Sequence, residues 1–239
     1  MIPKLNNNAQ QFIFKKTWKE VTEKIKEFWD KDFYITDFDY GDGMYRVLLS
    51  KGTGWNGQAY RHGKDFPKEK IQELWDKNYH ITNVTHDGSD WIVIMSGDTG
   101  INGQSWFTRA SFSDFEKKVD EEWAEGNDIT KVAYGNGLYL GITSGGLGWS
   151  QNWWNWSDFP TDELMDLKKS EGKIITDAFE FGDKCFTVAS GKTGYTKQRF
   201  HKNKDFQYLR KLLKNRWDDG YDLTTVSFFK GEWILVFSK

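Results

Sequence analysis

Hydrophobic and polar positions recur along the chain in a fixed order, and this recurrence predicts five similar units. An Ile/Leu-Thr pair stands at residues 35–36, 81–82, 129–130, 175–176 and 223–224. A serine closes an apolar run at residues 50, 96, 144, 190 and 238. Both landmarks recur at intervals of 46 or 48 residues and in the same phase. Self-similarity with this period is typical of solenoids, propellers and related repeat architectures.

Within each unit the pattern predicts one helix followed by three strands. Apolar residues four positions apart, such as Ile25 with Trp29 and Ile71 with Trp75, share one helix face. A short strand follows at the Ile/Leu-Thr pair, and after a glycine-bearing turn comes an apolar run, such as 91–95, typical of a buried strand. The helix opens on an aromatic residue, at Trp18, Phe66, Phe112, Phe159 and Phe206. A glutamine begins the third strand, at Gln58, Gln104, Gln151 and Gln198, and Gln10 matches it before the first helix.

These units predict a single domain over residues 1–239, divided at about 17–63, 64–109, 110–156, 157–203 and 204–239. The last unit ends before its third strand, whereas residues 9–16 have the pattern of one. We therefore expect an α/β toroid, a closed five-bladed propeller-like ring of helix-plus-three-antiparallel-strand units, in which the N-terminal strand 9–16 completes the last blade. Closure would remove an exposed sheet edge. The alternative is an open α/β array, which would need polar capping repeats.

The second unit carries the clearest motif string. It reads Phe66-Pro67, Ile71, Trp75, Ile81-Thr82, Trp91-x-Val93-x-Met95-Ser96, Thr99-Gly100 and Gln104. This string resembles an uncharacterised Trp/Gly-rich tandem repeat of the accessory regions of plant casein-kinase-like proteins and of bacterial caspase-like proteins. The resemblance covers residues 10–239 and is weakest in the fourth unit, where Lys169 and Cys185 replace aromatic residues. It implies an accessory binding module without known catalytic residues.

Composition and charge narrow the class of protein. The apolar runs do not exceed five residues, far below the ~20 of a membrane helix, and residues 1–8 contain no signal-peptide core. A net charge of -2 does not favour general nucleic-acid binding, although Lys and Arg gather in residues 192–216. We expect a cytoplasmic monomer that engages neither membranes nor nucleic acid.

No coherent catalytic set emerges from the sequence. Cys185 is the single cysteine, so disulfide frameworks and multi-cysteine metal sites are excluded. Pentein-type enzymes are five-fold α/β-propellers with a cysteine nucleophile, which makes Cys185 a candidate beside the four histidines. Its position matches Tyr45, Trp91, Tyr139 and Trp233 of the other units, however, and therefore indicates a small buried core residue. We expect no enzymatic activity, no metal and no cofactor.

The aromatic content of 17%, with 13 Trp, supplies the candidate ligand-binding residues. A large ring in a glycine-flanked turn is expected to be exposed and able to stack on a ligand. The regular glutamines can line a repeated pocket or can instead be structural amides between blades, and the second interpretation is favoured. The candidate set is Trp55, Gln58, Trp149, Gln151, Trp154, Trp156, Tyr195 and Gln198.

Three functions follow from these patterns. The favoured one is a non-enzymatic, repeat-built binding module for a protein or peptide partner. The alternative is a multivalent carbohydrate-binding lectin that stacks sugars on Trp55, Trp149 and Tyr195, with avidity from repetition. A pentein-like enzyme using Cys185 is the third and weakest hypothesis.

Overall fold

The computed structural model describes residues 9–157 and 162–239, which form five three-stranded antiparallel sheets, each with one helix. The first three units comprise β1 (Gln10–Lys15), α1 (Trp18–Trp29), β2 (Tyr34–Gly41), β3 (Met44–Ser50); β4 (Gln58–Gly63), α2 (Lys68–Trp75), β5 (Tyr79–His86), β6 (Trp91–Gly97); and β7 (Gln104–Arg109), α3 (Phe112–Ala124), β8 (Asp128–Gly135), β9 (Leu138–Ser144). The last two comprise β10 (Ser150–Ser157), α4 (Asp162–Ser170), β11 (Lys173–Phe181), β12 (Lys184–Gly191); and β13 (Gln198–Asn203), α5 (Phe206–Asp218), β14 (Asp222–Phe229), β15 (Glu232–Ser238).

Each helix is short and amphipathic, and its start is set by local chemistry. At α1, Thr17 accepts the backbone N–H of Glu20 while the Glu20 carboxylate accepts the N–H of Thr17, which forms a capping box. Val21 and Ile25, four positions apart, are fully buried on one face. Among the described residues, no helix is long and apolar enough to cross a membrane.

The aromatic markers predict most helix starts correctly. The predicted starts at Trp18, Phe112 and Phe206 are confirmed. The second helix begins at Lys68, two residues after its marker, because Pro67 occupies the N-cap position. The fourth marker, Phe159, lies outside the described residues.

The order of strands within a unit differs from the prediction. In every sheet the strand before the helix and the strand after it pair with opposite edges of the third, as in the order β1-β3-β2. Each unit is therefore strand–helix–strand–strand, and β4 belongs to the second sheet with β6 rather than to the first.

The expected pairing of the N-terminal strand with the last blade is wrong. β1 pairs with β3, from Gln10 opposite Ser50 to Lys15 opposite Tyr45. The edge of β15 that it would have occupied is taken by β13. Gln10 Nε2 donates to Ser50 Oγ at 3.0 Å, whereas the equivalent serine of the last blade, Ser238, already accepts the amide of Gln198.

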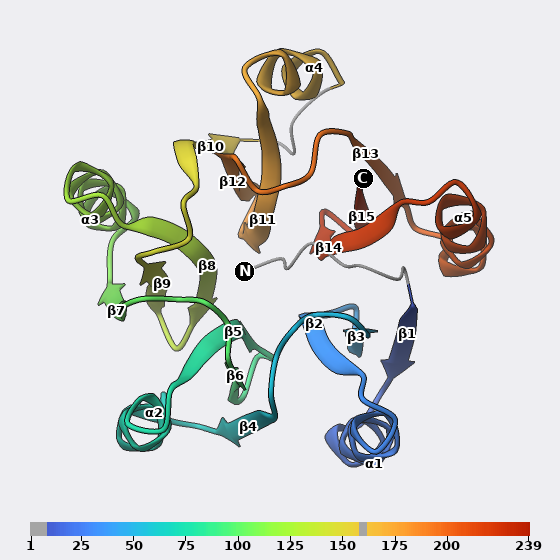
Figure 1. Ribbon diagram of the computed structural model, residues 1–239, viewed down its shortest axis with the longest axis horizontal. Helices are drawn as coiled ribbons and strands as arrows, with labels where there is room; N and C mark the ends of the chain where they lie inside the picture. Colours follow the sequence, from blue (N-terminus) through green and yellow to red (C-terminus); the bar gives the residue numbers. More distant parts are fainter. Residues whose placement is uncertain (1–8, 158–161) are drawn as a thin grey trace.

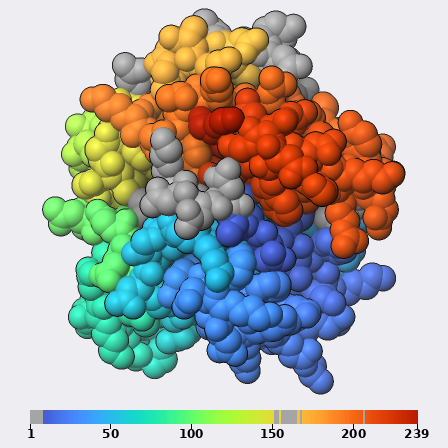
Figure 2. Space-filling view, turned by 45° about the vertical axis from the view of Figure 1, so that its right-hand side comes forward, coloured from blue at the N-terminus to red at the C-terminus, as the bar shows by residue number. Residues whose placement is uncertain are grey.

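The five units are arranged around a common centre (Figure 1). The strands β2, β5, β8, β11 and β14 lie innermost, and the helices lie at the periphery. Each inner strand contacts the next one, and β14 contacts β2, so the first and last units are neighbours. Figure 2 shows the same junction on the surface, where the blue N-terminal unit abuts the red C-terminal unit.

The apolar core is divided into clusters that neighbouring units share. Leu48 of the first unit packs with Leu235 and Phe237 of the last. Likewise Ile92 and Ile94 of the second unit pack with the first unit. Three further clusters join the second to the third, the third to the fourth and the fourth to the fifth unit. The units therefore complete one another's cores. Since each buried aliphatic side chain contributes about 1.5–3 kcal/mol, these shared contacts stabilise the arrangement of the units.

A glutamine side chain joins neighbouring units at the four junctions where the structure describes it. Gln58 accepts the N–H of Ile35 at 2.7 Å and donates to the Ile35 carbonyl at 2.9 Å. Its Oε1 also accepts the indole N–H of Trp29, and its Nε2 donates to Ser96. Gln104 repeats this set on Ile81 and Trp75.

We call this set of bonds the glutamine clamp. Gln10 makes it between the first and the last unit, on Leu223 and Trp217. Gln198 makes the backbone part of it on Ile175. The structural-amide interpretation is thus confirmed for four of the five glutamines. The fifth, Gln151, has its side chain outside the described residues.

Removal of the clamp at the junction of the first and last units is expected to lower the free energy of unfolding. Gln10→Ala leaves the N–H and carbonyl of Leu223 and the indole N–H of Trp217 without their partner in a buried setting, at about 1–3 kcal/mol for each lost group. Urea unfolding measures this loss. The matched control is Gln11→Ala on the exposed face of the same strand, which should change stability by less than about 0.5 kcal/mol. Equal stability of the two variants would contradict the clamp.

Candidate functional site

A backbone irregularity in every inner strand directs one side chain per unit towards the centre. The register shifts between Ile35 and Asp37, and at the same threonine position in the other four sheets. The threonine hydroxyl lies 2.8–3.3 Å from the serine Oγ of the central strand in all five units. Such bulges re-aim the following side chain. The residues that follow are Asp37, Asn83, Lys131, Asp177 and Thr225.

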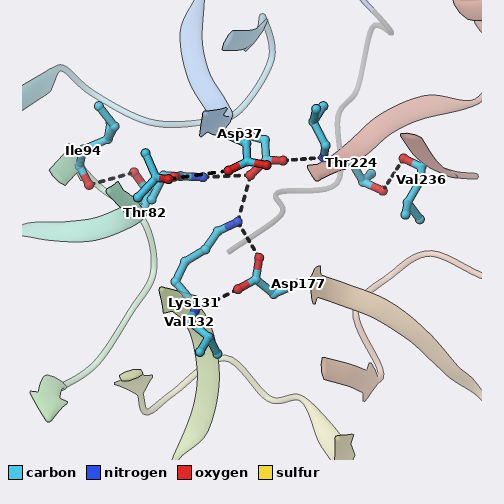
Figure 3. Close-up of polar contacts among 12 residues, drawn as sticks. Asp37, Thr82, Ile94, Lys131, Val132, Asp177, Thr224 and Val236 are labelled. Atoms are coloured by element: carbon cyan, nitrogen blue, oxygen red, sulfur yellow. Dashed lines mark hydrogen bonds and ion pairs between the residues drawn. The ribbon is translucent and has the colours of Figure 1, made fainter. Parts of the chain in front are cut away.

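Four of these side chains belong to one buried network (Figure 3). Lys131 Nζ lies 2.8 Å from Asp37 Oδ1 and 2.9 Å from Asp177 Oδ1. Asn83 Nδ2 donates to Asp37 Oδ1 at 2.7 Å. The network therefore links the first four units through a single ammonium group and two carboxylates.

The second oxygen of each carboxylate bonds to the backbone of the preceding unit. Asp37 Oδ2 accepts the N–H of Val226 at 2.6 Å, and Asp177 Oδ2 accepts the N–H of Val132 at 2.8 Å. Burial alone would lower the pKa of Lys131, but the carboxylates of Asp177 and Asp37 outweigh it and raise that pKa. Burial raises the pKa of Asp177 despite the nearby ammonium. The ammonium of Lys131 and the carboxylates of Asp37 and Asp177 thus stabilise one another.

A cavity of about 320 Å³ lies above this network, along the second halves of the inner strands. Asp37, Asn83, Lys131 and Asp177 form its floor. Residues become more exposed towards the hairpin turns, so the cavity opens at that end. The half-buried residues at this mouth are Asp39, Tyr40, His86, Tyr134, Phe179, Glu180, Phe181 and Phe228. We call this cavity the axial pocket.

Two carboxyl groups at the mouth have raised pKa values. Asp39 accepts the N–H of Tyr40 at 2.8 Å and of Phe228 at 3.0 Å, yet burial, with the nearby Asp37 charge, raises its pKa to about 8. Burial also raises the pKa of Glu180, which accepts one backbone N–H at 3.4 Å. The mouth therefore presents two acidic groups, and neither forms an ion pair with a cation among the described residues.

Several buried polar atoms of the inner strands have no hydrogen-bond partner among the described residues. They are Asn83 Oδ1, His86 Nε2, Thr225 Oγ1 and Ser227 Oγ. Asn83 and His86 line the axial pocket. Since an unsatisfied buried polar group costs about 1–3 kcal/mol, these two residues are places where a ligand can supply the missing partners.

The sequence-predicted site residues do not converge on this pocket. Trp55 and Tyr195 are each only 6% exposed, so the expected exposure of these turn aromatics is wrong. Trp55 packs with Ile101 and with the half-buried Trp149, because the turn folds over the end of the neighbouring sheets. Tyr195 packs on Ile174. Sugar stacking on these rings stays a prediction, and it would require them to leave their clusters.

The remaining candidates are spread over the periphery. Gln58 and Gln198 are engaged in the glutamine clamp. Trp154 is half-buried, stacks on Phe186 at 5.5 Å between ring centroids and donates to Asp120. The side chains of Gln151 and Trp156 lie outside the described residues.

The reactive residues weighed in the sequence are held in structural positions. Cys185 is fully buried, and burial raises the pKa of its thiol to about 12, so the thiolate nucleophile is disfavoured at neutral pH. Within the described ranges, His62, Asp87 and Asp90 could together hold a metal ion. Asp87, however, already accepts the Tyr45 hydroxyl at 2.5 Å and the N–H groups of its own turn, and His62 stacks on Trp18. These contacts explain the cluster without a metal.

Sequence reasoning missed the axial residues, although a signal was present. The residue after the repeated threonine is polar in every unit, as Asp, Asn, Lys, Asp and Thr, while its neighbours along the strand are mostly apolar. A polar position that recurs in each unit inside a buried strand must face either a partner or a cavity.

The matches to a known protein family have the same spacing as the repeat. A model described as a domain of unknown function, DUF7477, matches residues 5–136 and again residues 99–239. The chain belongs to the DUF7477 family. The second match begins two units after the first, in agreement with a tandem repeat. No curated protein matches the chain significantly. The uncharacterised repeat is thus confirmed, whereas the association with kinase-like and caspase-like proteins stays a prediction.

Removal of the central ammonium is expected to destabilise the fold strongly. Lys131→Met leaves Asp37 and Asp177 buried without a cation, which costs about 3–5 kcal/mol. In a double-mutant cycle by urea unfolding, Asp177→Asn should cost clearly less in the Lys131→Met background than in the wild-type chain. The loss in Lys131→Met should be smallest at acidic pH, because burial raises the pKa of Asp177 and its carboxyl group protonates there. Additive losses would contradict the network.

The raised pKa of Asp39 predicts a pH dependence of stability. Its folded pKa of about 8 lies above the unfolded value of about 3.9, so its contribution is complete below about pH 4 and is lost as the pH rises towards 8. Asp39→Asn should therefore gain stability over the wild-type chain between pH 5 and 8. The slope should stay below the limit of ~1.4 kcal/mol per pH unit for one proton, because Asp39 is half-buried. Parallel unfolding curves against pH would contradict this assignment.

Proposed function

We propose that the chain is a closed, five-bladed, propeller-like toroid that acts as a non-enzymatic binding module for a protein or peptide partner. Closure is supported by the contact of β14 with β2 and by the core that Leu48 shares with the last unit. The glutamine clamp of Gln10 on Leu223 acts at the same junction. A ring of this kind brings five inner strands to one pocket.

The observation that carries the binding function is a contrast between repeated and unrepeated positions. The clamp glutamine, the bulge threonine and the central-strand serine are the same in every unit, and they serve needs that every unit shares. At the axial position, four units place polar side chains of three kinds on one cavity: Asp37, Asn83, Lys131 and Asp177. This unequal set gives the cavity an asymmetric polar lining, which suits an asymmetric ligand.

The size and setting of the axial pocket favour one side chain of a larger partner. A volume of about 320 Å³ stands at the lower end of the range for small-molecule sites. The hairpin turns that follow the inner strands surround the mouth, and they offer a surface for the rest of a peptide. Fixed polar groups inside a pocket set orientation, and contacts around the mouth add affinity.

Other features support a monomeric module that works in the cytoplasm. In the described ranges, Leu138 and Tyr208 are the exposed large apolar side chains, which is little for an obligate subunit interface. The single cysteine is free and buried, and it requires no oxidising compartment.

A peptide selection tests the proposed function. A random-peptide display library is selected on the wild-type chain, and enriched peptides are measured on two variants. Thr85→Phe places a ring in the axial pocket and should weaken binding at least tenfold. Thr196→Phe, on an exposed turn away from the pocket, should leave it unchanged. Failure to enrich any peptide, or equal binding to both variants, would overturn the proposal.

A further inference from the structure

The axial pocket offers hydrogen-bond acceptors that could bind a cationic donor. The carboxyl groups of Asp39 and Glu180 line it, and Asn83 Oδ1 accepts no hydrogen bond from the described residues. The ammonium of Lys131 lies on the floor, but Asp37 and Asp177 both pair with it. The pocket as a whole is therefore acidic.

The raised pKa values of the two carboxyl groups at the mouth are consistent with a site that would accept a positive charge. Burial raises the pKa of Asp39 to about 8 and also raises the pKa of Glu180. Placing a cation beside either carboxyl would favour its charged form and reverse this shift. A ligand with a delocalised positive charge and several N–H groups would supply both the charge and the donors.

Aromatic rings complete the walls of the pocket. The rings of Tyr134 and Phe181 lie 3.9 Å apart between centroids, and Tyr40 and Phe228 also line the pocket. The faces of such rings attract cations, and the attraction grows when the cation leaves water. Carboxyl groups combined with aromatic walls therefore select an organic cation over a neutral polar group.

We propose that the axial pocket binds the guanidinium group of an arginine side chain from the partner. The planar guanidinium presents five N–H donors, which suits acceptors spread over Asp39, Asn83 and Glu180, and it stacks on aromatic faces. A lysine ammonium is a compact charge and reaches fewer of these groups at once. The inference rests on the proposed function, because it names the side chain that the partner inserts.

The cation pairs with the ionised carboxylate of Asp39. The affinity for the cation should therefore increase as the pH rises towards 8. Asp37 on the same strand, Arg46 on β3 and Lys131 on β8 act electrostatically on Asp39. His86 on β5 and Glu180 on β11 line the same pocket, and β14 contributes the N–H of Phe228. Glu180 titrates in the same direction as Asp39, so both groups contribute to the pH dependence.

Titration with blocked single amino acids tests the inference. Nα-acetyl-arginine N-methylamide should bind with a Kd on the order of 1 mM, as expected for a ligand of its size. The citrulline analogue, which has the same shape without the charge, should bind at least tenfold more weakly, and the lysine analogue should bind more weakly than the arginine one. NMR titration at pH 6, 7 and 8 gives the affinities, and that for arginine should rise with pH. Equal binding of the citrulline and arginine analogues would overturn the inference.

Two pocket variants and two matched controls locate the site. Glu180→Gln and Asp39→Asn should each weaken arginine binding about tenfold, and Asp39→Asn should also reduce its pH dependence. Glu73→Gln and Asp98→Asn, made at exposed positions outside the pocket, should bind as the wild-type chain does. Wild-type affinity in both pocket variants, with urea unfolding as the check that they fold, would overturn the assignment.

The outcomes separate this inference from the proposed function. Selected peptides that Thr85→Phe excludes, but whose affinity does not change when each arginine is replaced by citrulline, would support a peptide module and refute the guanidinium. Binding of the arginine analogue without enrichment of any peptide would refute the peptide module and leave the cation site standing.

Discussion

The innermost strand of each sheet has one edge that no further strand pairs with, and the structure is organised around satisfying that edge. Unpaired backbone N–H and carbonyl groups in a buried place are costly, so they must find side-chain partners. At the start of the strand the partner is a glutamine amide from the next unit, as Gln58 is for Ile35. Further along, carboxylates take this role, as Asp37 does for the N–H of Val226.

This constraint explains why charges occur at the centre of the molecule. A carboxylate that accepts a neighbouring N–H must lie in the interior, where it needs a cation. Lys131 supplies one ammonium for both Asp37 and Asp177. Asp39 makes the equivalent bond to Phe228 but forms no ion pair with a cation among the described residues, and burial raises its pKa. The acidic character of the axial pocket thus arises from the way in which the units are joined.

Stability and ligand binding consequently share one set of strands, and they also share the buried network on the floor of the axial pocket. Glutamine, threonine and serine recur in every unit and hold it in place. The axial position differs in charge and size from unit to unit, and in four units its side chain lines the cavity. Burial of the carboxyl groups of Asp39 and Glu180 lowers the stability of the free chain, and a bound cation would favour their ionised forms. Stability and binding are therefore linked through these two groups.

The sequence by itself determined the number of units, their period, the helix positions in three units and the buried apolar strands, because these depend on local spacing and amphipathicity. It also indicated the structural role of the glutamines, since a residue needed by every unit recurs in each. The phase of the repeat predicted from the sequence was wrong: a strand such as 58–63 lies between two sheets in sequence, and its pairing with β6, together with the bond from Gln58 to Ser96, assigns it to the second. The burial of Trp55 and the meeting of Asp37, Lys131 and Asp177 were likewise decided only by the tertiary structure. Residues about 46 and 94 positions apart come into contact because the units curve around a centre, and no local pattern encodes that curvature.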